Sequence, residues 1–80
     1  MAATDEWPEI DGALERELPF ASFPHAIEFV NRLAELAERE NHHPEIRVSG
    51  SRVTVRWWTH TTGGVSDSDH RLARLTDALL

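Results

Sequence analysis

The sequence predicts an α+β fold in which two β-hairpins and two helices follow one another in the order β-β-α-β-β-α. The turn dipeptides Asp11-Gly12 and Gly50-Ser51 each separate two short runs in which apolar and polar residues alternate. An apolar pattern of helical spacing lies between the two hairpins, and a second one ends the chain. Such helices bury their apolar side on one face of an antiparallel sheet.

The first hairpin is expected over residues 7–18 and the second over residues 46–57. Asp11-Gly12 suits the positive φ angles of a tight type I′ turn. In the second hairpin the alternation places Trp58 on the opposite strand face from Trp57. An exposed Trp58 would be part of an interface or of a ligand-contacting wall. The alternative is a twisted strand end that buries both tryptophans.

The long helix is expected from Pro24 to Glu40. Ser22 can cap its start, and proline is tolerated in a first helical turn. Asn41 tolerates a left-handed conformation and Pro44 cannot continue the helix, so the helix should end before them. The predicted buried stripe consists of Ala26, Ile27, Val30, Leu33, Ala34 and Ala37.

A second helix is expected after the Gly63-Gly64 break. Ser66 can cap it, and Asp69, three residues on, is an acidic variant of the capping box. The predicted apolar stripe consists of Leu72, Ala73, Leu75, Ala78 and Leu79.

Length and composition restrict the class of protein. Eighty residues make a single domain, expected over residues 1–80, and its small core leads us to expect a homo-oligomer, a dimer or a tetramer. The net charge is -6, there is no lysine, and the arginines form no stripe, so we expect no nucleic-acid partner. No apolar run is long enough to cross a membrane, and there is no cysteine. We therefore expect a cytoplasmic protein.

The five histidines are the candidates for acid–base chemistry, because an imidazole exchanges protons near neutral pH. His42 and His43 are adjacent at a predicted helix end, and His60 follows a predicted strand. The alternative for the pair is helix C-capping, and the alternative for His60 is a plain surface position. His25 and His70 lie in first helical turns and look incidental.

Other chemistries have weaker support. Glu38 and His42 are four residues apart and could share a helix face, but there is no HExxH motif and no second ligand pair. Gly63-Gly64 could cradle an anion, but the nucleotide-binding pattern with its lysine is absent. The sequence therefore favours neither a metal site nor a nucleotide site, and acid–base catalysis is the most available chemistry.

The combined spacing of these residues resembles the pterin-4a-carbinolamine dehydratases. Glu38 is followed after three residues by His42-His43-Pro44, then by Thr59-His60, by Gly63-Gly64, and by Asp69 nine positions after His60. The resemblance covers roughly residues 12–80. It also includes Leu18-Pro19-Phe20, Phe23 and Leu72-Ala73.

The resemblance implies dehydration of 4a-hydroxytetrahydropterin to quinonoid dihydropterin and water, in tetrahydrobiopterin recycling, without metal or cofactor. It implies that His42 and His60 are the acid and base, and that His43 binds or positions the pterin. Glu38 and Asp69 would orient imidazoles. The residues implied to contact the pterin are His43, Pro44, Thr59 and Trp58.

The chain also departs from the family pattern. A helix usually precedes the first hairpin, whereas six residues precede Trp7 here. Asn41, Ile46 and Gly50 stand where an acid, a tryptophan and an aromatic residue are frequent, respectively. The alternative function is a non-enzymatic binding, dimerisation or assembly module on the same fold. Retention of all three histidines favours the dehydratase over that module and over a purely structural domain.

Overall fold

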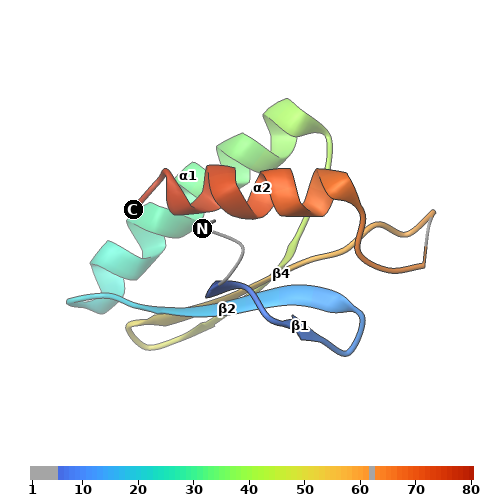
Figure 1. Ribbon diagram of the computed structural model, residues 1–80. Helices are drawn as coiled ribbons and strands as arrows, with labels where there is room; N and C mark the ends of the chain where they lie inside the picture. The colour runs from blue at the N-terminus through green and yellow to red at the C-terminus, as the bar shows by residue number, and fades with distance from the viewer. Residues whose placement is uncertain (1–5, 62) are drawn as a thin grey trace.

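The computed structural model describes residues 6–61 and 63–80, and its elements follow the predicted order (Figure 1). The strands form one antiparallel sheet in the order β1-β2-β4-β3, and both helices lie on the same side of it (Figure 1). The predicted α+β architecture is confirmed. The elements are β1 (Glu9–Ile10), β2 (Ala13–Pro19), α1 (Phe23–Glu40), β3 (Glu45–Ser49), β4 (Arg52–Trp57) and α2 (Asp67–Asp77).

The two hairpins join through their inner strands, β2 and β4. Leu14 pairs with Trp57 and Leu18 pairs with Val53, and all four side chains are buried. Because strand side chains alternate between faces, the residues between them, such as Arg56, lie on the face that the helices leave open. The sheet therefore has one apolar face and one charged face.

Helix α1 ends at Glu40, as the sequence predicts, and begins at Phe23, one residue before the predicted start. The Ser22 hydroxyl accepts a hydrogen bond of 3.3 Å from the backbone N–H of His25. Asn41 ends the helix with φ of 53°, in the left-handed region. In the first hairpin, Asp11 and Gly12 both have positive φ, as a type I′ turn requires.

The buried stripe of α1 differs from the predicted one. Phe29 and Leu36 are buried in the core, whereas Ala34 is exposed and Ile27 and Val30 are only half-buried. The helix is thus rotated so that its buried residues are Ala26, Phe29, Leu33, Leu36 and Ala37.

In α2, Leu72 and Ala73 are buried as predicted, but Ala78 is exposed and Thr76 takes a core position. The Thr76 hydroxyl accepts a hydrogen bond of 3.0 Å from the indole N–H of Trp57 and donates one of 2.7 Å to the Leu72 carbonyl. A buried indole N–H needs such a partner, so this pair ties α2 to the end of β4.

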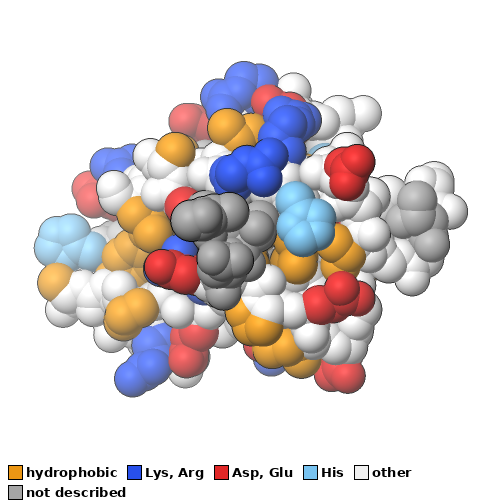
Figure 2. Space-filling view, in the orientation of Figure 1, with side chains coloured by type: hydrophobic (Ala, Val, Ile, Leu, Met, Phe, Trp, Pro, Cys, Tyr) orange, Lys and Arg blue, Asp and Glu red, His pale blue; other side chains and the backbone are white. Residues whose placement is uncertain are grey.

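The surface mixes charges of both signs. On the face shown in Figure 2, several arginine side chains lie beside acidic ones. On the open face of the sheet, Arg52 pairs with Glu17 and Arg47 with Glu45. Within residues 6–61 and 63–80, no helix has the length and apolar character needed to cross a membrane.

Candidate active site

Three segments that are distant in sequence meet beside the end of the sheet: the end of α1, the end of β4 and the start of α2. A cleft of about 260 Å³ opens there. This volume is near the lower end of the range for small-molecule pockets, roughly 300–1,000 Å³. The described residues that line it are Asn41, His42, His43, Thr59, His60 and Thr61.

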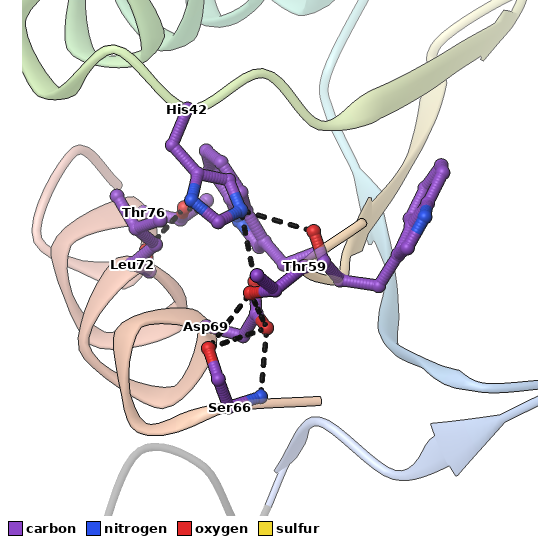
Figure 3. A network of polar contacts seen from close by, with 8 residues as sticks. His42, Thr59, Ser66, Asp69, Leu72 and Thr76 are labelled. Carbon is purple, nitrogen blue, oxygen red and sulfur yellow. Dashed lines mark hydrogen bonds and ion pairs between the residues drawn. The ribbon is translucent and has the colours of Figure 1, made fainter. Parts of the chain in front are cut away.

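His42 is the histidine held most firmly. Its Nε2 lies 3.0 Å from the Trp58 carbonyl oxygen and 3.0 Å from Asp69 Oδ1 (Figure 3). Its ring packs against Trp57 with a centroid distance of 5.6 Å, and only 19% of the side chain is exposed. The Trp58 carbonyl can only accept, so Nε2 carries the proton, and in the neutral ring Nδ1 does not. Asp69 Oδ1 lies within ion-pair distance but has no hydrogen bond in the described part of the chain.

Asp69 is fully buried at the start of α2. Its Oδ2 accepts hydrogen bonds from the Thr59 hydroxyl (2.7 Å), the Ser66 N–H (2.9 Å) and the Ser66 hydroxyl (3.1 Å), as Figure 3 shows. The Ser66 and Thr59 hydroxyls are themselves 2.7 Å apart. A buried carboxylate needs partners of this kind, and here they come from a helix cap, a strand end and His42.

The carboxylates pair with histidines in a pattern that the spacing did not reveal. Within the described residues, Asp69 contacts His42 and not His60, although the nine-residue spacing links it to His60. Glu38 Oε2 lies 2.5 Å from Nε2 of His43, not beside His42 four residues away. The left-handed turn at Asn41 explains this, because it ends the helical path and brings His43 back over Glu38.

His60 is exposed in the turn that follows β4. Backbone hydrogen bonds between Thr59 and Gly64 close this turn, and His60 and Thr61 face the cleft from it. The His60 ring lies against Trp58, with a centroid distance of 5.2 Å and an interplanar angle of 56°. His43 and His60 therefore face the same cleft with exposed rings, while His42 forms part of its floor.

Other predicted residues lie outside this arrangement. Pro44 and Trp58, expected as substrate contacts, are not among the described residues that line the cleft, although Thr59 is. Trp58 is half-buried and Trp57 is buried, so the strand end covers only one tryptophan fully. In the described part of the chain, no three His, Asp or Glu side chains are grouped to hold a metal ion.

The sequence did not lead us to expect Thr61 at the cleft, although Thr61 neighbours His60, and it identified Asn41 as a helix end and as a departure from the family pattern. It also assigned Ser66 only to helix capping, whereas Ser66 contributes two of the hydrogen bonds to Asp69. The capping box of Ser66 and Asp69 can be identified in the sequence, but the hydrogen bond from Thr59 to Asp69 cannot.

The fold and the cleft define an α+β protein whose clustered histidines and carboxylates suit acid–base chemistry. A family model described as "Pterin 4 alpha carbinolamine dehydratase" matches residues 1–79. The chain belongs to this family, and the resemblance identified from the sequence is confirmed.

Two curated relatives carry the name "Putative pterin-4-alpha-carbinolamine dehydratase". The one from Picosynechococcus sp. is 43% identical over 74 residues, which cover 92% of this chain and 80% of the relative. The one from Syntrophotalea carbinolica is 48% identical over 73 residues, which cover 89% of this chain and 65% of the relative.

Two solved structures share the fold. A transcriptional coactivator/pterin dehydratase from Brucella melitensis aligns with a TM-score of 0.87 and 35% identity, over 94% of this chain and 82% of that one. A pterin dehydratase-like protein described as a RuBisCO assembly factor in the alpha-carboxysome aligns with a TM-score of 0.80 and 25% identity, over 92% and 88%.

Proposed function

We propose that this chain dehydrates a 4a-hydroxytetrahydropterin to the quinonoid dihydropterin and water, in tetrahydrobiopterin recycling in the cytoplasm. The observation that carries the proposal is that one cleft brings together His42, His43 and His60, two of them paired with carboxylates. Family membership supports the substrate class.

The reaction needs two proton transfers. The C4a–O bond breaks, and the departing hydroxyl takes a proton and leaves as water. A base takes the proton from N5, and the electron pair of the broken N5–H bond forms the C4a=N5 double bond. One acid and one base close to neutral pKa suffice for both steps, and each such transfer contributes about 10² to 10⁴-fold to the rate.

We assign these transfers to His43 and His60, because their rings are exposed in the cleft. Glu38 occupies Nε2 of His43 and leaves Nδ1 for exchange with the substrate. This differs from the expectation from the resemblance, which gave the transfers to His42 and His60. Nε2 of His42 faces two acceptors, so its proton is engaged within the protein, and we assign His42 a positioning role with Asp69.

The departures from the family pattern bear unequally on this proposal. Gly50 lies in the β3–β4 turn, at the opposite end of β4 from the cleft, and Ile46 packs against the core. Asn41 lines the cleft and presents an amide where an acid is frequent. We therefore expect Asn41 to affect pterin binding more than the other two positions do.

The direct test is the dehydration rate of a 4a-hydroxytetrahydropterin with purified protein. We expect a rate well above the uncatalysed one, and a large loss in His43→Ala. His25→Ala is the matched control, because His25 is exposed at the other end of α1. No acceleration by the folded wild-type protein would contradict the proposal.

That negative result would favour the second candidate, a non-enzymatic binding, dimerisation or assembly module. The observation in its favour is the structural likeness to the pterin dehydratase-like RuBisCO assembly factor. Such a module would need the fold and its surface but no proton transfer, so its function would survive loss of His43 and His60.

A further inference from the structure

Arg56, near the end of the inner strand β4 on the open sheet face, is held in one position. Its Nε lies 3.0 Å from Glu15 Oε1, and its Nη1 lies 3.0 Å from Glu45 Oε1. Its Nη2 donates hydrogen bonds to the backbone carbonyls of Ile10 (2.8 Å) and Asp11 (3.2 Å). The side chain is only 17% exposed. Partners on β2, β3 and the β1–β2 turn therefore fix the guanidinium plane.

Arg56, Trp58 and His60 follow one another along the same side of the chain, as alternate residues of an extended segment do. The Arg56 guanidinium carbon lies 5.7 Å from the centroid of the Trp58 ring, within the range of a cation–π contact. The same indole also contacts the His60 ring, at a centroid distance of 5.2 Å. A row of contacting groups thus runs from the fixed arginine to the cleft.

Trp58 also reaches the second cleft histidine through its backbone, because its carbonyl oxygen accepts from His42 Nε2. It does not line the cleft itself among the described residues. Trp58 therefore contacts two of the cleft histidines without lining the cleft. A large aromatic side chain beside an exposed histidine restricts the rotamers that the imidazole can adopt.

We infer that Arg56 is a positioning residue that fixes His60 in the cleft by acting through the indole of Trp58. Its effect on turnover rests on the proposed function, whereas its effect on the geometry of His60 does not. Small displacements of a reacting group have large kinetic consequences, and a misplacement of about 1 Å can cost roughly 10²-fold in rate. Arg56 is not among the described residues that line the cleft, so its loss should lower kcat and leave KM nearly unchanged.

The variant Arg56→Gln tests this inference, with Arg52→Gln as its matched control. Arg52 lies on the same strand and the same face and also pairs with an acid, Glu17, at 3.3 Å, but it is 61% exposed and four residues from Arg56. Both variants remove one arginine charge from the open face. Only the first removes the group that covers Trp58.

The spectroscopic measurement is the NMR chemical shift of the His60 ring protons, assigned by their disappearance in His60→Gln. All variants are measured in one buffer at one pH, and the shift reports the ring current of Trp58 at the His60 ring. We expect the shift to move towards that of free histidine in Arg56→Gln and to stay unchanged in Arg52→Gln. Unchanged His60 shifts in folded Arg56→Gln would overturn the inference.

Two further variants keep the test decisive if Arg56→Gln is too unstable to study. Arg56→Lys keeps a positive charge beside Glu15 and Glu45 but lacks the planar guanidinium, and should move the His60 shift in the same direction by a smaller amount. Trp58→Ala leaves the ion pairs of Arg56 intact but removes the ring current itself, so its effect is read in kcat and not in the shift. In an active protein, kcat of Arg56→Gln should fall about tenfold with KM within about twofold, a smaller loss than a full 1 Å displacement causes. If the wild type has no dehydratase activity, the shifts still decide the positioning role.

Discussion

Replacing Asp69 by asparagine separates the two contributions that this buried carboxylate makes. Oδ2 receives three hydrogen bonds, and Oδ1 lies beside the His42 Nε2 proton. Asparagine has the same shape but only one oxygen. If that oxygen keeps the bonds from Thr59 and Ser66, the amide NH₂ points at Nε2 of His42, and two donors face each other. If His42 changes tautomer to accept from the amide, the Trp58 carbonyl loses its donor.

The expected loss of stability follows from this count. Hydrogen bonds to charged groups contribute about 1.5–3 kcal/mol and neutral ones about 0.5–1.5 kcal/mol, so weakening the three bonds to Oδ2 and losing the one to the Trp58 carbonyl costs about 2–3 kcal/mol. For a domain of this size that lowers the melting temperature by roughly 10–20 °C. Unfolding free energies of about 0.05–0.15 kcal/mol per residue mean that the variant should still fold at low temperature.

Asp67→Asn is the control, because Asp67 lies in the same helical turn but is exposed. Its loss should change only the interaction with the helix dipole, about 0.3–1 kcal/mol. Melting is followed by circular dichroism, and turnover is measured well below both transitions. We expect Asp69→Asn to turn over at least about tenfold more slowly, which is about 1.4 kcal/mol in activation free energy. Equal melting temperatures and equal turnover in the two variants would refute the reasoning.

Four other outcomes are expected. His43→Ala and His60→Ala should each lower turnover by roughly 10²-fold or more, with unchanged circular dichroism; retained activity in both would remove them from the mechanism. Dialysis against a strong chelator should leave activity intact, and activity restored only by added metal would contradict this. Light scattering at micromolar concentration should give a multiple of the monomer mass, because an 80-residue core is small. The hydrogen bond from Arg71 holds the pKa of Glu40 below the usual 4.5. The ionised Glu40 therefore stabilises the fold fully above about pH 4.5, and this stabilisation is lost as the pH falls through the lowered pKa. Glu40→Gln should flatten this acid-side decrease in melting temperature, and an unchanged pH profile would count against the Arg71 contact.

The order of the elements could be predicted because local signals mark each boundary. Ser22, Asn41 and the Asp11-Gly12 turn each act through their own backbone or through the next few residues. The orientation of α1 could not be predicted as well, because the sequence is apolar on more than one side. Which side is buried depends on how Phe29 and Leu36 fit the sheet, and that is a tertiary property.

The candidate site shows the same division. The residue types and the region were predictable, since His42, His43 and His60 do line one cleft. The pairing of carboxylates with histidines was not predictable. The number of residues between two side chains indicates their distance in space only within a regular helix or strand. The left-handed residue Asn41 intervenes between Glu38 and the histidines, and a loop intervenes between His60 and Asp69.

The choice between a dehydratase and an assembly module depends on the cleft, because relatives described in both ways share this fold. The sheet and helices are held by apolar packing and by the buried bonds of Trp57 and Asp69. The exposed Glu38–His43 pair adds little to stability, since solvent screens such pairs, and His60 is exposed as well. A module that needed only the fold would not require two exposed imidazoles facing one cleft, each held by a partner of its own. Proton transfer gives both of them a use, and for that reason we favour the dehydratase.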